Sequence, residues 1–585
     1  MSTLPRWNLE DLFASPTDPA IEQTFLRASE MAKDLVTDFK GKLPSLEAAA
    51  ILDLLQRYEN ALQTITKPVA YASLRHATDT RDAEREGFQR RTRARAVSIE
   101  RDLLWVDLEL AQLPEATLNA LLVAPEVAPY KHVLEKILAS KPHQLSEAQE
   151  QLIADLEQTS GRAFATLFEQ EDSTKLYTFK QTQRTCTDLL KDLKSPDRET
   201  RHEAADAISA GLQEEEQRRS FIYTTLIKHK ETLDRYRAFA IPEASQHLAN
   251  ETTAEAVEAM ALAVEAHTGS FQRYYQWKAK KLGIETLTDY DRYAPLSNVE
   301  KTYTFDEARA MILRAFERFS PVFSDLAKKF FDNGWIDAEP APGKRGGAFC
   351  SYVSADLHPY VFVNFQGNIN DVLTLAHELG HAIHASLARP NGYLQFDTPL
   401  TLAETASVFG EMLTFDLLRN ELTDPKDRQA LMAHKIESIF ATVFRQITLY
   451  RFEQKAHTHV RANGFATPET YHKLWEEVHT SLFGNALTVT PGYRRWWSYI
   501  SHFFYVPFYV YAYSFGELLT CCLYEQSQHN PEAFREKYIA FLSRGGSANP
   551  ATLLAPLGIN PESTETWAKG LDWIDQLIEE TIQLG

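Results

Sequence analysis

The residues with the clearest chemical meaning are two histidines that flank a glutamate, in the run His377-Glu378-Leu379-Gly380-His381. Histidines at positions i and i+4 lie about one turn apart on a helix, so two neutral imidazoles can bind one Zn²⁺. The glutamate between them lies beside the metal and can accept a proton from its bound water. The spacing therefore predicts a zinc site with His377 and His381 as ligands and Glu378 as general base.

A helix wheel over Asp371–Ala388 separates an apolar side from the side that carries the histidines. No proline interrupts this range, and Gly380 costs only about 1 kcal/mol relative to alanine, which close approach of a neighbouring backbone would offset. The alternative is a chance pattern, but chance rarely places one on a clean amphipathic helix. We therefore predict a buried helix. Its core face comprises Val372, Leu375, Ala376, Leu379 and Ile383.

A third ligand must be found outside this five-residue pattern. His384 lies on the same helix face, but seven residues place it roughly 10 Å along the axis from His377. Three imidazoles on one straight helix converge poorly on a tetrahedral ion. We therefore predict that His384 lies behind the ligands or lines the site, and ligation by His384 is the less favoured alternative.

Carboxylates further along the chain are better candidates for the third ligand. Glu404 and Glu411 are seven residues apart, which places both on one face of a second helix among small and apolar residues. Acidic groups in such surroundings are costly unless they are paired or bind a metal. We predict that Glu404 is the third ligand and that Glu411 orients a ligand histidine through its second ring nitrogen. The alternative is that one or both of these carboxylates, Glu411 more readily than Glu404, simply face solvent.

A second group of polar side chains lies in the range His502–Tyr513. If this range is helical, one imidazole and three phenols fall within about 80° of one another. Such groups can donate hydrogen bonds to the oxyanion that forms when water attacks a peptide carbonyl. The alternative is an aromatic stripe that packs in the core, and Pro507 would start or kink the helix. The four residues are His502, Tyr505, Tyr509 and Tyr513.

The rest of the chain is dominated by helical patterns, in which apolar residues recur every three to four positions. Pro359–Phe365 is an exception, since its β-branched and aromatic residues predict a strand just before the zinc helix. Such a strand could pair with an extended peptide through its backbone. A polar turn near residue 200 predicts two parts, a helical amino-terminal region over 1–200 and a catalytic domain over 201–585.

Composition and charge exclude several classes of protein. Hydrophobic residues at 44% and charged residues at 24% are typical of a globular chain. The net charge of −19 disfavours nucleic acid and anionic membranes as partners, because these attract basic patches. The amino terminus lacks a secretory signal, no apolar run reaches the roughly 18 residues of a membrane span, and four cysteines make no disulfide framework. We therefore expect a cytoplasmic protein, and the oligomeric state is not predicted.

These motifs together resemble the thimet-oligopeptidase-like zinc metallopeptidases, and specifically their oligoendopeptidase F branch. The resemblance rests on HELGHAIH at His377–His384, on the 22-residue interval to Glu404, and on the surrounding AETAS…GE. Further similar segments are spread along most of the chain. They are RWNLEDLF at Arg6–Phe13, YDRYAPL at Tyr290–Leu296, GKRGGAFCSY at Gly343–Tyr352, HFFYVPFYVYAYSFGELL at His502–Leu519 and SRGGSANP at Ser543–Pro550.

The resemblance implies a mainly α, helical, two-lobed metallopeptidase fold with a deep central substrate channel and a small β-sheet beside the zinc helix. It also implies a zinc-dependent oligoendopeptidase that hydrolyses internal bonds of short unfolded peptides and binds one Zn²⁺ per chain. Members of the family place a cluster of histidine and tyrosine side chains at the site. His502 and Tyr513 match this cluster best, with Tyr505 or Tyr509 beside them.

Two other functions remain open at this point. A zinc carboxypeptidase-type exopeptidase would need a group that fixes the chain terminus. A non-catalytic peptide-binding protein would keep the metal for stability alone, but it has no need of the base Glu378.

Overall fold

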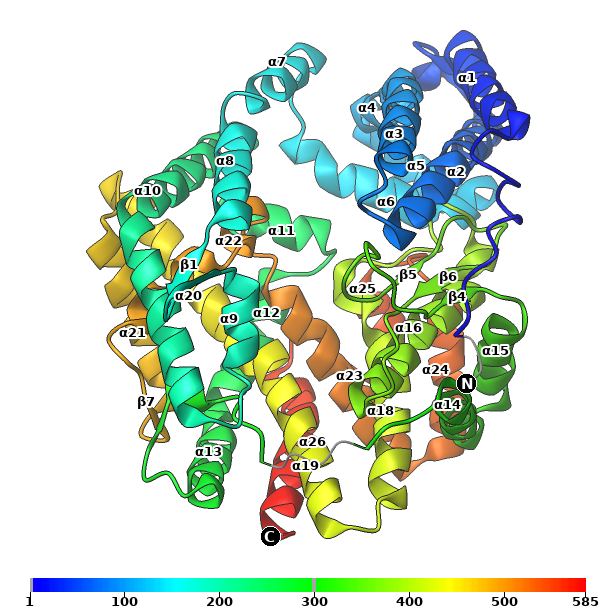
Figure 1. The fold of residues 1–585 in the computed structure, drawn as a ribbon. Helices are drawn as coiled ribbons and strands as arrows, with labels where there is room; N and C mark the ends of the chain where they lie inside the picture. The colour runs from blue at the N-terminus through cyan, green and yellow to red at the C-terminus, as the bar shows by residue number, and fades with distance from the viewer. Residues whose placement is uncertain (1–3, 297–300, 585) are drawn as a thin grey trace. The chain divides into compact units, whose positions relative to one another are not determined.

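The computed structural model describes residues 4–296 and 301–584, and most of its regular structure is helical (Figure 1). The expected mainly α fold with small sheets is confirmed. None of the helices in these two ranges is long and apolar enough to span a membrane. The chain packs as two compact units. Unit 1 comprises the described residues of Met1–Pro142, Glu300–Leu418 and Gln526–Ile559, and unit 2 those of His143–Val299, Arg419–Glu525 and Asn560–Gly585.

Unit 1 contains the histidine helix. Its main described elements are α1 (Pro19–Phe39), α2 (Ala48–Thr78), α3 (Ala83–Leu103), α4 (Trp105–Gln112), α5 (Glu115–Val123), α6 (Lys131–Ser140), α14 (Phe305–Phe319), α15 (Pro321–Asp332), β4 (Ile336–Asp337), β5 (Phe349–Ser351), β6 (Tyr360–Phe362), α16 (Ile369–Ala388), α17 (Leu400–Ala403), α18 (Thr405–Glu421), α24 (Pro531–Ser543) and α25 (Pro550–Leu554).

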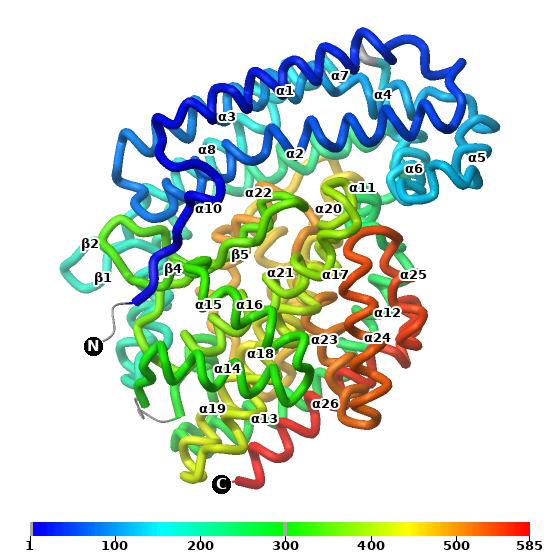
Figure 2. Tube along the Cα trace, turned by 90° about the vertical axis from the view of Figure 1, so that its right-hand side faces the viewer, coloured from blue at the N-terminus to red at the C-terminus, as the bar shows by residue number. Residues whose placement is uncertain are grey.

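The amino-terminal part of unit 1 is a layer of helices, in which the long helices α1, α2 and α3 pack against one another (Figure 2). Asp18 begins α1, because its side chain accepts a hydrogen bond from the N–H of Ala20 at 2.9 Å and Pro19 fits the first turn. The apolar faces of α1–α6 share one core, in which Leu54, Leu55 and Val106 are fully buried. This part of unit 1 is therefore a helical bundle with its own core.

A three-stranded sheet precedes the histidine helix, with the order β4-β6-β5. Strand β6 confirms the strand predicted within Pro359–Phe365. It pairs in parallel with β4 and antiparallel with β5, so both of its edges are occupied. The expectation that this strand pairs with a peptide is therefore wrong, because its backbone groups already bind its two neighbours.

Trp7, from the opening RWNLEDLF segment, packs against the same sheet. Its ring centroid lies 5.5 Å from that of Phe362 and 6.0 Å from that of Tyr360. The N–H of Asn8 donates to the carbonyl of Gly334 at 2.9 Å, just before β4. The opening motif therefore holds the sheet of unit 1 in place.

Unit 2 contains the His502–Tyr513 segment. Its main described elements are α7 (Glu147–Glu157), α8 (Gly161–Thr174), β1 (Tyr177–Phe179), β2 (Thr182–Arg184), α9 (Cys186–Asp192), α10 (Arg198–Tyr236), α11 (Ala244–Ala249), α12 (Ala254–Ala266), α13 (Thr268–Leu282), β3 (Leu287–Thr288), α19 (Pro425–Ile439), the π-helical turn η6 (Phe440–Phe444), α20 (Arg445–Asn463), α21 (Pro468–Phe483), β7 (Leu487–Thr488), the 3₁₀ helix η7 (Tyr493–Tyr499), α22 (His502–Tyr505), α23 (Tyr511–His529) and α26 (Thr564–Gln583).

The helix expected near residue 200 is α10, which begins at Arg198. Its N-cap is Asp197, whose carboxylate accepts a hydrogen bond from the N–H of Thr200 at 3.0 Å. The wider division into an amino-terminal region over 1–200 and a catalytic domain over 201–585 stays a prediction.

Candidate active site

Helix α16 presents the histidines as the sequence predicts. It begins with a capping box, in which the side chain of Asn368 and the side chain of Asp371 bind each other's backbone N–H groups. The predicted core face is buried throughout, while His377 and His381 remain partly exposed. The core face comprises Val372, Leu375, Ala376, Leu379 and Ile383.

Glu404 lies at the junction of two helices, as the C-cap residue of α17 and directly before α18. The helix predicted through Glu404 and Glu411 is therefore divided at Glu404. The hydroxyl of Ser407 donates to Glu404 Oε2 at 2.7 Å, and the hydroxyl of Tyr538 on α24 donates to the carbonyl of Thr405 at 2.8 Å. These bonds fix the turn that carries the glutamate.

Gly380 allows α16 and α18 to approach each other closely. A Cβ atom on Gly380 would lie 2.3 Å from the carbonyl oxygen of Ala406 and 2.6 Å from Cα of Ser407. On α18, a Cβ on Gly410 would lie 3.1 Å from the carbonyl oxygen of Ala376. Two glycines therefore set the helix spacing, which accounts for a residue that costs helix stability on its own.

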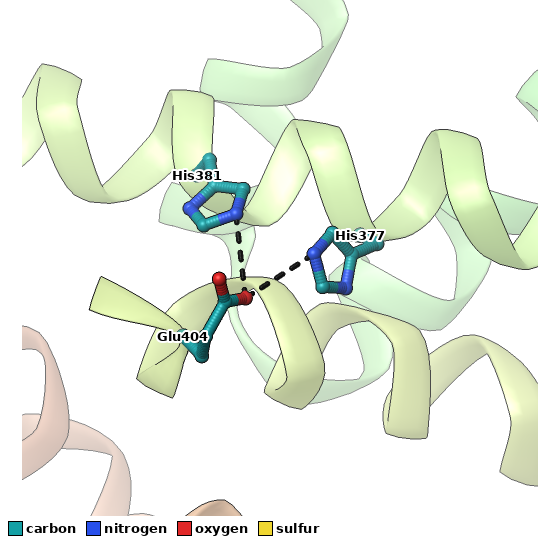
Figure 3. Close-up of side chains that lie close together, drawn as sticks. All are labelled: His377, His381 and Glu404. Atoms are coloured by element: carbon teal, nitrogen blue, oxygen red, sulfur yellow. Dashed lines mark ion pairs between the residues drawn. The ribbon is translucent and has the colours of Figure 1, made fainter. Parts of the chain in front are cut away.

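The two histidines and Glu404 converge on one point (Figure 3). Oε2 of Glu404 lies 3.3 Å from Nε2 of His377 and 3.5 Å from Nε2 of His381. In tetrahedral Zn²⁺ coordination with bonds of about 2.0–2.1 Å, ligand atoms lie about 3.3 Å apart. The spacing of these atoms therefore fits a zinc ion.

Glu411 contacts the other ring nitrogen of His377, as predicted, with Oε2 3.3 Å from Nδ1. Burial lowers the pKa of His377, but hydrogen bonds with Glu404 and Glu411 outweigh burial and raise it above its usual range. Burial raises the pKa of Glu404, but bonds to the two imidazoles outweigh that effect and lower it. Glu404 is thus held as a carboxylate that can bind a cation.

Glu378 and His384 are buried on the same helix and differ from the three converging residues. Only 6% of Glu378 is exposed, and its Oε2 has no hydrogen-bond partner among the described residues. Burial raises the pKa of Glu378 above its usual value. His384 is 2% exposed and lies outside the three-residue group, and burial lowers its pKa to about 3. His384 is therefore a neutral, buried residue outside the group of three converging residues.

In unit 2, the structure brings together three of the four predicted polar residues in His502–Tyr513. Nε2 of His502 lies 3.2 Å from the hydroxyl of Tyr513, and the ring of Tyr509 lies 5.6 Å from that of His502 and 5.3 Å from that of Tyr513. Tyr505 instead packs its ring against Phe168, at 6.2 Å. We refer to His502, Tyr509 and Tyr513 as the His/Tyr cluster.

The range His502–Tyr513 is not one continuous helix, because the chain breaks between α22 and α23, on either side of Pro507. Phe508 in this break has a left-handed backbone, with φ +63°, which is uncommon for a bulky residue. Its N–H donates to Oε1 of Glu453 on α20 at 2.9 Å. Glu453 is fully buried, and burial raises its pKa to about 8 although the Phe508 N–H partly opposes this. A buried carboxyl thus holds the break that shapes the His/Tyr cluster.

Tyr352 is a site residue that the sequence did not single out. It follows β5, and its ring centroid lies 6.5 Å from that of His381. Its phenol is within electrostatic range of both Glu378 and Glu404. The residue stands at the end of the GKRGGAFCSY segment.

Comparisons with known proteins extend over nearly the whole chain. The family model of Peptidase family M3 matches residues 192–573, and that of Oligopeptidase F matches residues 109–174. An oligoendopeptidase F homolog of Lactococcus lactis subsp. lactis is 28% identical over 595 residues, which cover 99% of this chain and 98% of the relative. Oligopeptidase PepF of Bacillus subtilis is 26% identical, with 99% and 87% covered.

Solved structures share the fold. Oligoendopeptidase-F from Enterococcus faecium superposes with a TM-score of 0.73 at 20% identity, covering 97% of this chain and 99% of its own. A structure from Chlamydophila abortus reaches a TM-score of 0.87 at 24% identity, covering 99% and 98%.

We predict that Gly380→Ala lowers both stability and metal affinity, because the new methyl group pushes α18 and Glu404 away from the histidines. Overpacking of this kind costs about 1–3 kcal/mol. Gly269→Ala is the matched control, since it lies in helix α13 with open space around it and should be neutral or stabilising. Thermal unfolding and bound metal are measured on both variants. Equal metal content and stability in the two would contradict the close-approach argument.

We also predict that Glu453 makes stability depend on pH. Its pKa is about 8 in the folded state against 4.5 ordinarily, so the folded state holds the proton more tightly. Stability therefore falls as the pH rises from about 5 to about 8, by up to roughly 5 kcal/mol, and then levels off. Glu453→Gln should remove this dependence. The melting temperatures of the wild type and of Glu453→Gln are measured from about pH 5 to about pH 8. If they change in parallel with pH, Glu453 is not the source of the dependence.

Proposed function

Because the chain belongs to peptidase family M3, we propose that it is a zinc-dependent oligoendopeptidase that cuts internal bonds of short unfolded peptides. The observation that carries the proposal is the convergence of His377, His381 and Glu404 beside the buried Glu378. Relatives that match almost the whole chain carry the names oligoendopeptidase F homolog and oligopeptidase, which supports short peptides as substrates. The cytoplasmic location stays a prediction.

His377, His381 and Glu404 would hold the metal, because two neutral imidazoles and one carboxylate are a donor set that suits Zn²⁺ in hydrolases. When bound, Zn²⁺ supplies Lewis-acid chemistry that acidifies water and polarises a peptide carbonyl. Glu411 fixes the tautomer and orientation of His377 through Nδ1. The carboxylates also offset the charge of the cation.

Glu378 is the general base in this proposal. Its carboxylate takes a proton from the attacking water and passes it to the nitrogen of the leaving amine. Burial raises its pKa towards neutrality, which makes both the uptake and the release of the proton easier. This double role is easier for a buried carboxyl that no cation holds ionised, and Oε2 of Glu378 has no hydrogen-bond partner among the described residues.

His502, Tyr509 and Tyr513 are proposed to donate hydrogen bonds to the oxyanion. A phenol has an ordinary pKa of about 10, so it stays protonated and keeps its donor capacity at neutral pH. The mutual contacts of the His/Tyr cluster orient these donors before substrate arrives. The role predicted for Tyr505 stays a prediction, since its ring packs elsewhere in unit 2.

Incubation with a peptide library of mixed lengths, read by mass spectrometry, tests the proposal. Cuts at internal bonds of short peptides support it. Stepwise loss of terminal residues indicates an exopeptidase, and peptides that bind but stay intact indicate a binding protein. Either of these two outcomes overturns the proposal.

We predict that Glu378→Gln keeps its fold and its zinc but loses about 10²–10⁴-fold in kcat, because the amide has the same shape and cannot accept a proton. Metal analysis and peptide hydrolysis are measured on one sample. High residual turnover in a zinc-loaded variant would remove Glu378 from the base role.

We predict three levels of zinc affinity among variants of the surrounding residues. Glu404→Ala removes a ligand and a negative charge, so it should be largely zinc-free. Glu411→Ala loses only the bond that orients His377, which typically costs about 10–100-fold. His384→Ala should stay loaded, because His384 lies outside the converging group. Titration with Zn²⁺ gives the order of the three affinities. If His384→Ala binds zinc more weakly than Glu404→Ala does, His384 rather than Glu404 is the third ligand.

A further inference from the structure

Among the described residues, two arginines of unit 2 have no ion pair with a carboxylate, whereas other buried cations of this unit do. Arg292 is 4% exposed and donates to the hydroxyl of Tyr493 at 2.9 Å. Arg445, the first residue of α20 after the π-helical turn η6, donates to the hydroxyl of Tyr499 at 3.1 Å. By contrast, the cations that do have a carboxylate are Arg201 with Asp291, Arg219 with Glu215, Lys278 with Glu437, and Lys435 with Glu517.

The surroundings of the two arginines are mainly aromatic. The guanidinium of Arg292 lies 5.0 Å from the ring centroid of Tyr493 and 5.5 Å from that of Tyr293. Asp289 acts on Arg292 electrostatically, but among the described residues it makes no ion pair with Arg292, and it accepts a hydrogen bond from the N–H of Thr490 at 2.6 Å. Neutral phenols attract a cation but do not neutralise it.

Arg445 is the more exposed of the two and the less compensated. It is partly exposed, as are Tyr293 and Tyr499, so solvent reaches these side chains. We refer to Arg292, Arg445 and the phenols of Tyr293, Tyr493 and Tyr499 as the Arg/Tyr group. Arg292 lies within electrostatic range of Arg445 and repels it. Desolvation of such a charge is costly, and a bound anion would offset that cost. The Arg/Tyr group therefore has the chemistry of an anion site.

The Arg/Tyr group also lies within electrostatic range of the His/Tyr cluster in unit 2. Tyr499 is three residues before His502, and the positive charge of Arg445 acts directly on the His502 ring. Burial and Arg445 together lower the pKa of His502, so its imidazole is neutral at pH 7. An anion bound at Arg445 would thus lie beside the groups that are proposed to face the substrate.

We propose that Arg445, with Arg292 behind it, binds a carboxylate of the peptide substrate. This inference rests on the proposed peptidase function and adds a substrate preference to it. A guanidinium offers two parallel N–H groups that match the two oxygens of a carboxylate. The carboxylate is either the C-terminus of the peptide or an Asp or Glu side chain.

Two pairs of fluorogenic peptides separate these sources. One pair differs only in a free or amidated C-terminus, and the other has Glu or Gln at one position with both C-termini amidated. The wild type should cleave the acidic member of one pair more efficiently. Arg445→Gln should lower kcat/KM for that member by about 10–100-fold and for its neutral partner by less than about threefold. The pair that responds identifies the source.

Arg451→Gln is the matched control on the same helix. The guanidinium of Arg451 is already neutralised by Glu258 and Glu265, at 2.8 and 2.7 Å. This variant should keep the wild-type ratio between acidic and neutral peptides. Arg445→Gln should also keep the wild-type melting temperature, because it breaks no ion pair, whereas a purely structural role would lower it.

The proposal is overturned if the wild type has the same kcat/KM for both members of each pair. It is also overturned if Arg445→Gln lowers kcat/KM equally for both members. Either result leaves the peptidase function standing when the peptides are cleaved. If no peptide is cleaved, the proposed function fails, and fluorescence anisotropy with the same peptides decides the carboxylate site. Equal affinities of wild type and Arg445→Gln for the acidic peptide would then overturn it.

Discussion

The close approach of α16 and α18 is the constraint on which the candidate site depends. Backbone meets backbone where Gly380 lies against Ala406 and Ser407, and Gly410 repeats the arrangement one turn further on. If side chains at these two positions held the helices further apart, the carboxylates of Glu404 and Glu411 would lie further from the ring of His377. With the glycines, Glu404 and Glu411 contact His377 from its two sides. Two residues without side chains thus determine where the charged ones meet.

This arrangement concentrates charge in a poorly solvated place, and the balance of that charge limits what the site can do. Three carboxyl groups, those of Glu378, Glu404 and Glu411, surround two imidazoles. A divalent cation relieves the repulsion among them, which ties the stability of the site to its metal. Burial raises the pKa of Glu378, which has no hydrogen bond to an imidazole among the described residues. Hydrogen bonds from the two imidazoles instead lower the pKa of Glu404 and keep it ionised. Neighbouring carboxyls on adjoining helices therefore acquire opposite acid–base behaviour from their surroundings alone.

Sequence periodicity predicts the features that are local to one helix, and it fails where distant segments meet. The spacing of His377 and His381 and the burial of Leu379 follow from 3.6 residues per turn. Glu411 could be assigned because position i+7 repeats a helix face. The His502–Tyr513 range could not be predicted correctly, because its break depends on a bond between Phe508 and Glu453, which are 55 positions apart.

Two other features were hidden from the sequence for the same reason. The occupied edges of β6 depend on β4 and β5, neither of which has a strong strand pattern. The phenols around Arg292 and Arg445 come from distant segments, near residues 293, 493 and 499. No single segment of the sequence therefore predicts that they meet. Aromatic residues are common in cores, and only their convergence on an uncompensated cation is unusual.

The order in which the chain is synthesised has a consequence for how this protein matures. Unit 1 is completed only by its last stretch, Gln526–Ile559. From that stretch, Tyr538 supports the turn after Glu404, and the N–H of Gly546 donates to the carbonyl of Gln395 at 2.8 Å. His377 and His381 therefore leave the ribosome long before Gln526–Ile559, the segment that supports the turn after Glu404. The group of His377, His381 and Glu404 is therefore supported in full only late in synthesis, and a nascent chain that terminates early carries these residues without that support.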